Sequence, residues 1–430
     1  MAVDLPFLTA YDPPGTSEGV LDPLGLYQIA DQLAVELVPA VRERMQRIRF
    51  LTAMAVGSLV TEGLEDDPSV RDASPYLVWE WLLVEAIVRT KQGDPAIWGV
   101  PGTLVTRRAL ERYGYLDAAS YLKTPRIFGF NGIYKRLAVH LGIVDVNLAP
   151  GPNAEELADA WAKDRGLEGL AAAKPTLHEW AATVRRGLAE RPPRTKASWT
   201  ERRWTELADA FAPAGIRGRE KRLLKQLLLS ADERSLNALP EIWNLQDEFS
   251  DESFSEESLH ARLRSVAPRF APLLGAIRRY EAMARHLQDA FDVLRAEAGR
   301  FDVQGYAVAE VAKDPDFARC VADLCRRFER ANEALAVLPR IGGMVSATFQ
   351  ERFRAFAEPM SVPAYAHALC DHHVRIQKGK GDKRAWFDTL GGGRIFLRLA
   401  YREPRRALQL DRYVHDYRGR PIRRFKADLS

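Results

Sequence analysis

Cysteine is scarce in this chain of 430 residues, which has three: Cys320, Cys325 and Cys370. They cannot all pair with one another and their spacing matches no zinc-binding pattern, so their number is typical of a protein of the reducing cytoplasm. Long apolar runs are missing as well, since no stretch approaches the ~20 residues that a membrane-spanning helix needs. The first residues also lack the basic start and apolar run of a signal peptide. We therefore expect a cytoplasmic protein without a membrane partner.

Signatures of catalysis and of cofactor binding are thin. The sequence has no Gly-x-Ser-x-Gly segment, and the glycines at 379–381 and 391–393 lack the order of a phosphate-binding loop. One short segment contains several residues of the types that bind metals: His367, Cys370, Asp371, His372, His373 and Asp382. A single cysteine among clustered histidines lacks the paired spacing of a zinc finger, and no acidic-x-Lys pair on strand positions is present to hold Mg²⁺. We expect no cofactor, no metal and no catalytic activity, with a metal-dependent nuclease at this segment as the alternative.

Positive charge is concentrated at the C-terminal end. Residues 371–430 hold sixteen Lys and Arg against seven Asp and Glu, a net charge of +9. The whole chain carries only +4, so residues 1–370 are net acidic at −5. Aromatic residues lie among these cations, and cations beside flat aromatic rings suit the phosphates and bases of a nucleic acid. The alternative is an ordinary solvated surface rich in arginine.

The same segment contains the clearest strand pattern of the chain. From Arg394 to Tyr401 apolar and basic residues alternate with a period of two, which predicts a β-strand with one apolar face. We expect residues 374–377 to be its partner and residues 413–421 to form a further strand and turn. The residues between, 378–384, then form a basic loop. The predicted phosphate contacts are Lys378, Lys380, Lys383, Arg384, Arg394, Arg398, Arg405 and Arg406, and Trp386 or Tyr401 is expected to stack on an unpaired base.

The remainder of the chain shows helical spacing of apolar residues. This pattern predicts helices within residues 24–61, 76–90, 155–190 and 199–356. The pair Pro192-Pro193 is the best candidate for a linker. Residues 241–257 are acidic and contain no Lys or Arg. We expect this acidic stretch to contact either a basic partner or the protein's own basic C-terminal segment.

Residues 101–161 carry a second pattern. Predicted helices at 104–113 and 118–122 are followed by a helix at 133–141, a short strand at 144–148, a Pro-Gly turn and a new helix from residue 155. This order resembles a winged helix-turn-helix module over about residues 100–160. The resemblance implies that the start of the third helix approaches DNA bases. The matching positions are Asn131, Tyr134, Lys135 and Arg136. Winged helices also serve as protein-interaction modules, and this alternative stays open.

The predicted fold is therefore mainly α, with a small α/β part at its end. We expect an N-terminal helical region with the winged-helix-like module (1–165), a helix and linker (166–194), a helical domain (195–366) and a basic α/β region (367–430). The general form is similar to uncharacterised bacterial accessory proteins of anti-phage defence operons. We expect a non-catalytic DNA-binding subunit of a DNA-handling complex, with DNA favoured over RNA and a helicase or nuclease among its protein partners. A protein–protein scaffold is a further alternative.

Overall fold

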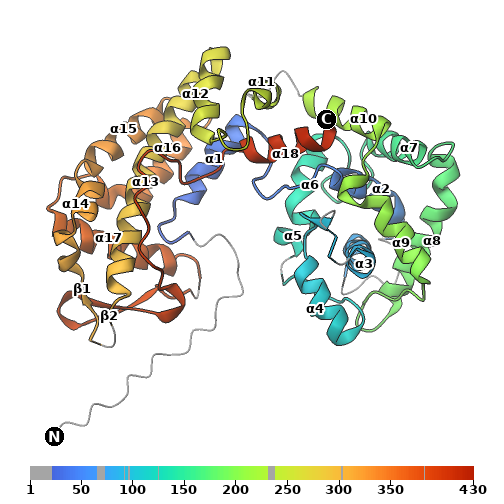
Figure 1. Cartoon of the computed structure of the whole chain (residues 1–430), viewed down its shortest axis with the longest axis horizontal. Helices are drawn as coiled ribbons and strands as arrows, with labels where there is room; N and C mark the ends of the chain where they lie inside the picture. The colour runs from blue at the N-terminus through green and yellow to red at the C-terminus, as the bar shows by residue number, and fades with distance from the viewer. Residues whose placement is uncertain are drawn as a thin grey trace, which may run out of the picture. The chain divides into compact units, whose positions relative to one another are not determined.

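A computed structural model describes residues 22–64, 73–91, 93–94, 97–123, 125–230, 238–301, 304–381 and 383–430. Helices make up 64% of this part, and one small antiparallel sheet completes it (Figure 1). The chain divides into two compact units, each built from separated segments. Unit 1 comprises residues 1–34 and 251–417, and unit 2 comprises residues 35–250 and 418–430. Within the described residues, no helix is both long and apolar enough to cross a bilayer.

Unit 2 is helical and is assembled around one helix, α2 (Phe50–Thr61). This helix is buried on almost all sides, because its sequence, FLTAMAVGSLVT, contains no charged residue. A helix that is apolar all round must be covered by other helices. The helices of this unit are α3 (Pro75–Thr90), α4 (Thr103–Tyr113), α5 (Pro125–Phe128), α6 (Phe130–His140), α7 (Ala154–Asp164), α8 (Leu170–Ala189), α9 (Glu201–Phe211), α10 (Gly218–Leu229), α11 (Leu239–Leu245) and α18 (Gly419–Leu429).

A buried carboxylate links α3 to the start of α6 in this unit. Glu80 is 1% exposed. Tyr121 donates its hydroxyl to Oε1 of Glu80 at 3.0 Å, and the amide of Asn131 donates to Oε2 at 3.3 Å. Gly129 precedes the helix, and a Cβ there would collide with the Glu80 carboxylate. The free amides at the start of α6 are thus satisfied from inside the core rather than by a ligand.

The burial of Glu80 predicts that the stability of unit 2 depends on pH. Burial raises the pKa of Glu80 to about 7, from 4.5, against the opposing hydrogen bonds. Because the folded state prefers the protonated form, the free energy of unfolding falls as pH rises from 4.5 to 7, by about 3 kcal/mol for a shift of this size. Glu80→Gln should lose this part of the pH dependence and be more stable than the wild type at pH 8.

Urea unfolding followed by tryptophan fluorescence measures this effect, since eight of the nine tryptophans lie in unit 2. Glu85 and Asp428 also have raised pKa values. The difference between the wild-type and Glu80→Gln curves isolates Glu80 from them. Parallel curves for the two proteins would contradict the assignment.

Unit 1 is built on α13 (Ala271–Ala298), a helix of 28 residues. The other helices packed in this unit are α12 (Glu256–Val266), α14 (Pro315–Val321), α15 (Leu324–Ala336), α16 (Gly342–Phe353) and α17 (Val362–Lys378), while α1 (Tyr27–Leu37) contains the border between the units. The sheet has the order β1 (Tyr306–Ala307), β3 (Arg394–Leu397), β2 (Phe387–Leu390), with both pairs antiparallel. Figure 1 shows this sheet at the end of α13 and α17.

A second buried carboxylate holds the end of the chain in unit 1 against α13. Glu281 is fully buried in the middle of the helix. It receives hydrogen bonds from the Nδ1 atom of His415 at 2.7 Å, from the Tyr417 hydroxyl at 2.7 Å and from the amide of Val414 at 2.5 Å. Burial raises the pKa of Glu281, but His415 and these hydrogen bonds outweigh burial, so the pKa lies below its ordinary value.

The prediction of a mainly α fold is confirmed, and so is a small sheet near the C-terminus. The strand expected from Arg394 to Tyr401 is confirmed in its first half, which is β3, with Ile395 and Leu397 facing the core. Its second half is wrong, because residues 399–401 form a short 3-10 helix and Leu399 is exposed. The partner strand expected at 374–377 is wrong, because these residues continue α17 to Lys378. The strand expected within 413–421 is also wrong: its first half is an irregular segment bonded to Glu281, and α18 begins at Gly419.

The sequence analysis divides the chain into four consecutive regions, whereas the structure divides it into two units of residues in mutual contact. The basic region 367–430 is shared between them, since residues up to 417 belong to unit 1 and α18 belongs to unit 2. In α18 the apolar residues Ile422, Phe425 and Leu429 are buried. An amphipathic helix joins the unit that covers its apolar face, whatever its distance along the chain.

Candidate nucleic-acid interface

Most of the arginines expected to contact phosphates are engaged inside unit 1. Arg394 donates to the carbonyl oxygens of Gln304 and Gly305, at 2.8 and 2.5 Å. Arg398 pairs with Asp388 at 2.7 Å. Arg406 is exposed but pairs with Glu403 at 2.7 Å. The prediction that these side chains form one free cationic face is wrong.

Arg405 is the most strongly held of this group. Its guanidinium binds Asp314, Asp316 and Glu297, with the Asp316 contact at 2.6 Å and the Glu297 contact at 3.2 Å. These hydrogen bonds raise the pKa of Arg405 against the effect of burial. The partners lie 89 to 108 residues earlier in the sequence, 91 in the case of Asp314. Arg405 therefore fastens the C-terminal segment to the start of α14.

The loop after α17 keeps part of its predicted character. Lys378, Lys383 and Arg384 are exposed. Lys380 is half-buried and donates to the carbonyl oxygen of Asp22, and burial lowers the pKa of its ammonium group. Three of these four cations thus remain at the surface of unit 1.

The aromatic residues expected to stack on a base stack on one another. The rings of Trp386 and Tyr401 are parallel, with centroids 4.7 Å apart. Trp386 is only 4% exposed, and its other neighbours are Phe291 and His373. The expectation that Trp386 is available to an unpaired base is wrong for this reason.

The histidines of the alternative nuclease site are structural. His372 bonds the carbonyl oxygen of Leu24 at 2.8 Å, and His373 bonds that of Pro23 at 2.9 Å and the amide of Trp386 at 3.0 Å. Burial lowers the pKa of both to about 4, so they are neutral at pH 7. Asp382 lies outside the described residues. Across the part of the chain that the structure describes, no group of three or more His, Cys, Asp or Glu could hold a metal ion.

In the winged-helix-like region, α6 is turned differently from the expectation. Tyr134 is completely buried, and its hydroxyl accepts hydrogen bonds from the amides of Gln46 and Arg47, at 2.9 and 3.1 Å. Burial raises the pKa of this phenol above its ordinary value. The expectation that Tyr134 faces a ligand is therefore wrong.

The remaining predicted positions on α6 are only partly available. Asn131 and Lys135 are half-buried, and Arg136 is exposed. The amide of Asn131 is bonded to Glu80, as described above. The short strand expected at 144–148 is reduced to a single bridge between Val144 and Pro150. The start of this helix is therefore not free to bind an anion.

A cationic site that the sequence analysis did not single out lies on α12, α13 and α15 of unit 1. There a hollow of about 640 Å³, the arginine pocket, has a polar lining of arginines without a carboxylate. Its floor contains small residues, among them Gly275 and Ala282, which let the helices leave an open space. The lining arginines are Arg264, Arg278, Arg279, Arg327 and Arg330.

These arginines have few internal partners. Among the described residues, the side chains of Arg264, Arg278, Arg279 and Arg330 form neither an ion pair nor a hydrogen bond. The Nε atom of Arg327 is buried without a partner, and burial lowers the pKa of this guanidinium despite the nearby charge of Asp323. The sequence contains part of the cause: Arg264 and Arg279 have no carboxylate three or four residues away on either side. Helical ion pairs need one of these two spacings. Glu281 lies three residues after Arg278, but its oxygens are bonded to His415 and Tyr417.

A second hollow of about 390 Å³, the His260 pocket, adjoins the first one. The two share Arg264, Arg278 and Ala282 in their walls. Here the charges are mixed, because Glu257, Glu281 and Asp411 line this pocket together with Arg264, Arg278 and Arg412. The two pockets are thus neighbours: all charged residues of the first are arginines, whereas the second has charges of both signs.

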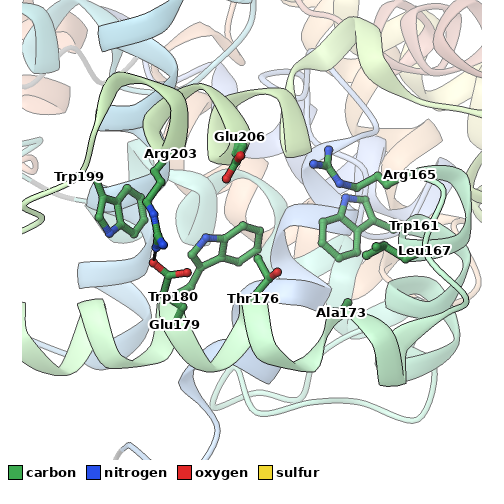
Figure 2. Close-up of a pocket in the computed structure, with 10 residues that line it drawn as sticks. All are labelled: Trp161, Arg165, Leu167, Ala173, Thr176, Glu179, Trp180, Trp199, Arg203 and Glu206. Carbon is green, nitrogen blue, oxygen red and sulfur yellow. Dashed lines mark ion pairs between the residues drawn. The ribbon is translucent and has the colours of Figure 1, made fainter.

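Unit 2 has a hollow of its own, of about 310 Å³, lined by Trp161, Trp180 and Trp199 (Figure 2). Its charged residues are engaged by neighbouring groups of unit 2. Arg203 of α9 forms an ion pair with Glu179 of α8 (Figure 2). Arg165 lies over the Trp161 ring at 5.5 Å. Because these charges are already engaged, this hollow lacks the free cations of the arginine pocket.

The contacts of Arg405 predict a structural effect without an effect on DNA binding. Arg405→Ala should lower the free energy of unfolding of unit 1 by about 1–2 kcal/mol, since charge-assisted hydrogen bonds of a partly exposed group are lost. Hydrogen exchange of residues 304–336 in urea measures this loss. Unchanged hydrogen exchange together with weaker DNA binding would instead indicate that Arg405 contacts DNA.

Comparison with known proteins identifies no relative: no protein-family model, no curated protein and no solved structure matches this chain. The function is therefore inferred from the residues and geometry described above.

Proposed function

We propose that the protein binds DNA by its phosphates in the arginine pocket of unit 1 and has no catalytic activity of its own. One observation carries this proposal: five arginines line a hollow that contains no carboxylate, and four of them have no ion-pair or hydrogen-bond partner among the described residues. Positive charge held together without a counter-charge costs free energy through repulsion. A polyanion removes this cost, which supports a phosphate-bearing ligand.

Arginine suits this role better than lysine. Its planar guanidinium offers five N–H donors and can bind two phosphate oxygens at once. The helices α13 and α15 that carry Arg278, Arg279 and Arg330 are well packed in the core of unit 1, so the donors are held on a rigid base. Lys378, Lys383 and Arg384, which are exposed in the same unit, remain candidates for further phosphate contacts.

The wider role stays part of the same proposal. A subunit of a bacterial DNA-handling or anti-phage defence complex is what the sequence resemblance supports, with a helicase or nuclease supplying the chemistry. Residues 118–122 form a turn instead of the expected second helix, α5 is a four-residue helix directly before α6, and the start of α6 is capped by Glu80. This geometry favours a protein-interaction or purely structural role for the winged-helix-like region over contact with bases.

Salt dependence of DNA binding tests the proposal. The apparent association constant should fall linearly on logarithmic axes, with a slope of about 0.9 per phosphate neutralised on duplex and about 0.7 on single strands. The double variant Arg279→Ala/Arg330→Ala should lower this slope by the contribution of two phosphates. The matched control is Arg319→Ala/Arg354→Ala, which removes two exposed arginines of unit 1 outside both pockets.

A charge placed in the pocket gives an independent test. A Cβ at Gly275 would meet no atom within 4 Å, so Gly275→Glu introduces a carboxylate beside the arginines without a collision. We expect it to abolish DNA binding at 150 mM salt. Gly343→Glu is the control, because Gly343 is also helical and open but lies on α16. Equal affinities for both glutamate variants would refute the proposal, and no binding even at low salt would point to an acidic protein partner.

A further inference from the structure

His260 is a buried side chain whose polar atoms are unused within the described residues. It lies on α12 and is 3% exposed. Neither ring nitrogen has a hydrogen-bond partner. The closest carboxylate oxygen, Oε2 of Glu256, is 3.7 Å from Nε2, which is too far for a hydrogen bond. Buried polar groups are almost always hydrogen-bonded, and an exception calls for an explanation.

The imidazole of His260 is neutral at physiological pH. Burial lowers its pKa to about 4, although the charge of Glu281 opposes the shift. A neutral imidazole has one nitrogen that donates and one that accepts. His260 therefore presents an unused donor and an unused acceptor, a pair that a phosphate, which only accepts at this pH, could satisfy only in part.

The surroundings of His260 fit a flat, uncharged group. The ring of Tyr413 lies 5.6 Å from the imidazole at an angle of 61°, and Tyr413 also lines the pocket. The pocket volume, about 390 Å³, lies in the range of ordinary small-molecule sites. Its acidic residues Glu257 and Asp411 balance the arginines, so this part is less attractive to a phosphate than the arginine pocket beside it.

We propose that the His260 pocket holds an unstacked nucleobase of the strand whose phosphates lie on the neighbouring arginines. This inference rests on the proposed function and deepens it, because it makes the ligand single-stranded. A base edge offers both donors and acceptors to His260, and the Tyr413 ring offers it an aromatic neighbour. In a duplex that edge is used by the complementary base, so a duplex can fill only the arginine pocket. Arg264 and Arg278, which line both pockets, join the base to its phosphates.

The test compares a single-stranded oligonucleotide with the same strand made of abasic units, which keeps the phosphates and removes the bases. The wild type should bind the strand with bases about tenfold more tightly, as expected for one or two held bases. It should also bind the single strand more tightly than the matched duplex at equal salt. Fluorescence anisotropy at several salt concentrations measures all three affinities.

Two variants locate the effect in the His260 pocket. His260→Leu removes both nitrogens and breaks no hydrogen bond, and Ala261→Leu narrows the pocket from an exposed position. Each variant should lower the affinity for the strand with bases to that for the abasic strand. The affinity for the abasic strand itself should stay unchanged. Ala322→Leu, at an exposed position outside both pockets, should leave the tenfold ratio intact.

The outcomes separate the two proposals. If the wild type binds both strands equally while Gly275→Glu still abolishes binding, the base pocket is wrong and phosphate binding stands. If the duplex binds as tightly as the single strand, the base pocket is wrong as well. If no strand binds at low salt, both the proposal of phosphate binding and the proposal of a base pocket are wrong.

Discussion

The buried carboxylate of Glu281 is the interaction on which the site in unit 1 depends. It draws the irregular segment 413–417 onto the middle of α13 through His415, Tyr417 and the amide of Val414. That segment contributes the Tyr413 wall of the His260 pocket. A fully buried charge is tolerated only where hydrogen bonds and an opposite charge satisfy it. The position of Tyr413 in the pocket wall therefore depends on the hydrogen bonds of Glu281.

Arginine is used in two opposite ways in unit 1. Arg394, Arg398 and Arg405 bind carbonyl or carboxylate oxygens of the same unit and hold the C-terminal segment in place. Arg278 and Arg279 stand on α13 without such partners in the part of the chain that the structure describes. A high density of arginine in the sequence thus does not mark a ligand surface by itself. Whether a carboxylate lies within reach in the folded chain decides between the two uses.

His372, His373 and Tyr134 show why the role of a single residue is difficult to infer from the sequence. His372 and His373 are adjacent and near a cysteine, a pattern shared by metal sites, but each meets a carbonyl oxygen of residues 23–24 in the core. Tyr134 stands on a helix at a position expected to be free, but residues 46–47 come from far away in the chain and cover it. The unused nitrogens of His260 gave no signal at all in the sequence, because only burial makes them exceptional.

The amino-acid sequence by itself determined the helical class, the position of most helices and the alternation of β3, because these follow from the local spacing of apolar residues. It also determined that Arg279 lacks a carboxylate partner three or four residues away. Only the tertiary structure decided which cations are neutralised, because the partners are distant: Asp314 lies 91 residues from Arg405. It also decided that the C-terminal segment is divided between two units, since each apolar face settles where complementary apolar surface is available.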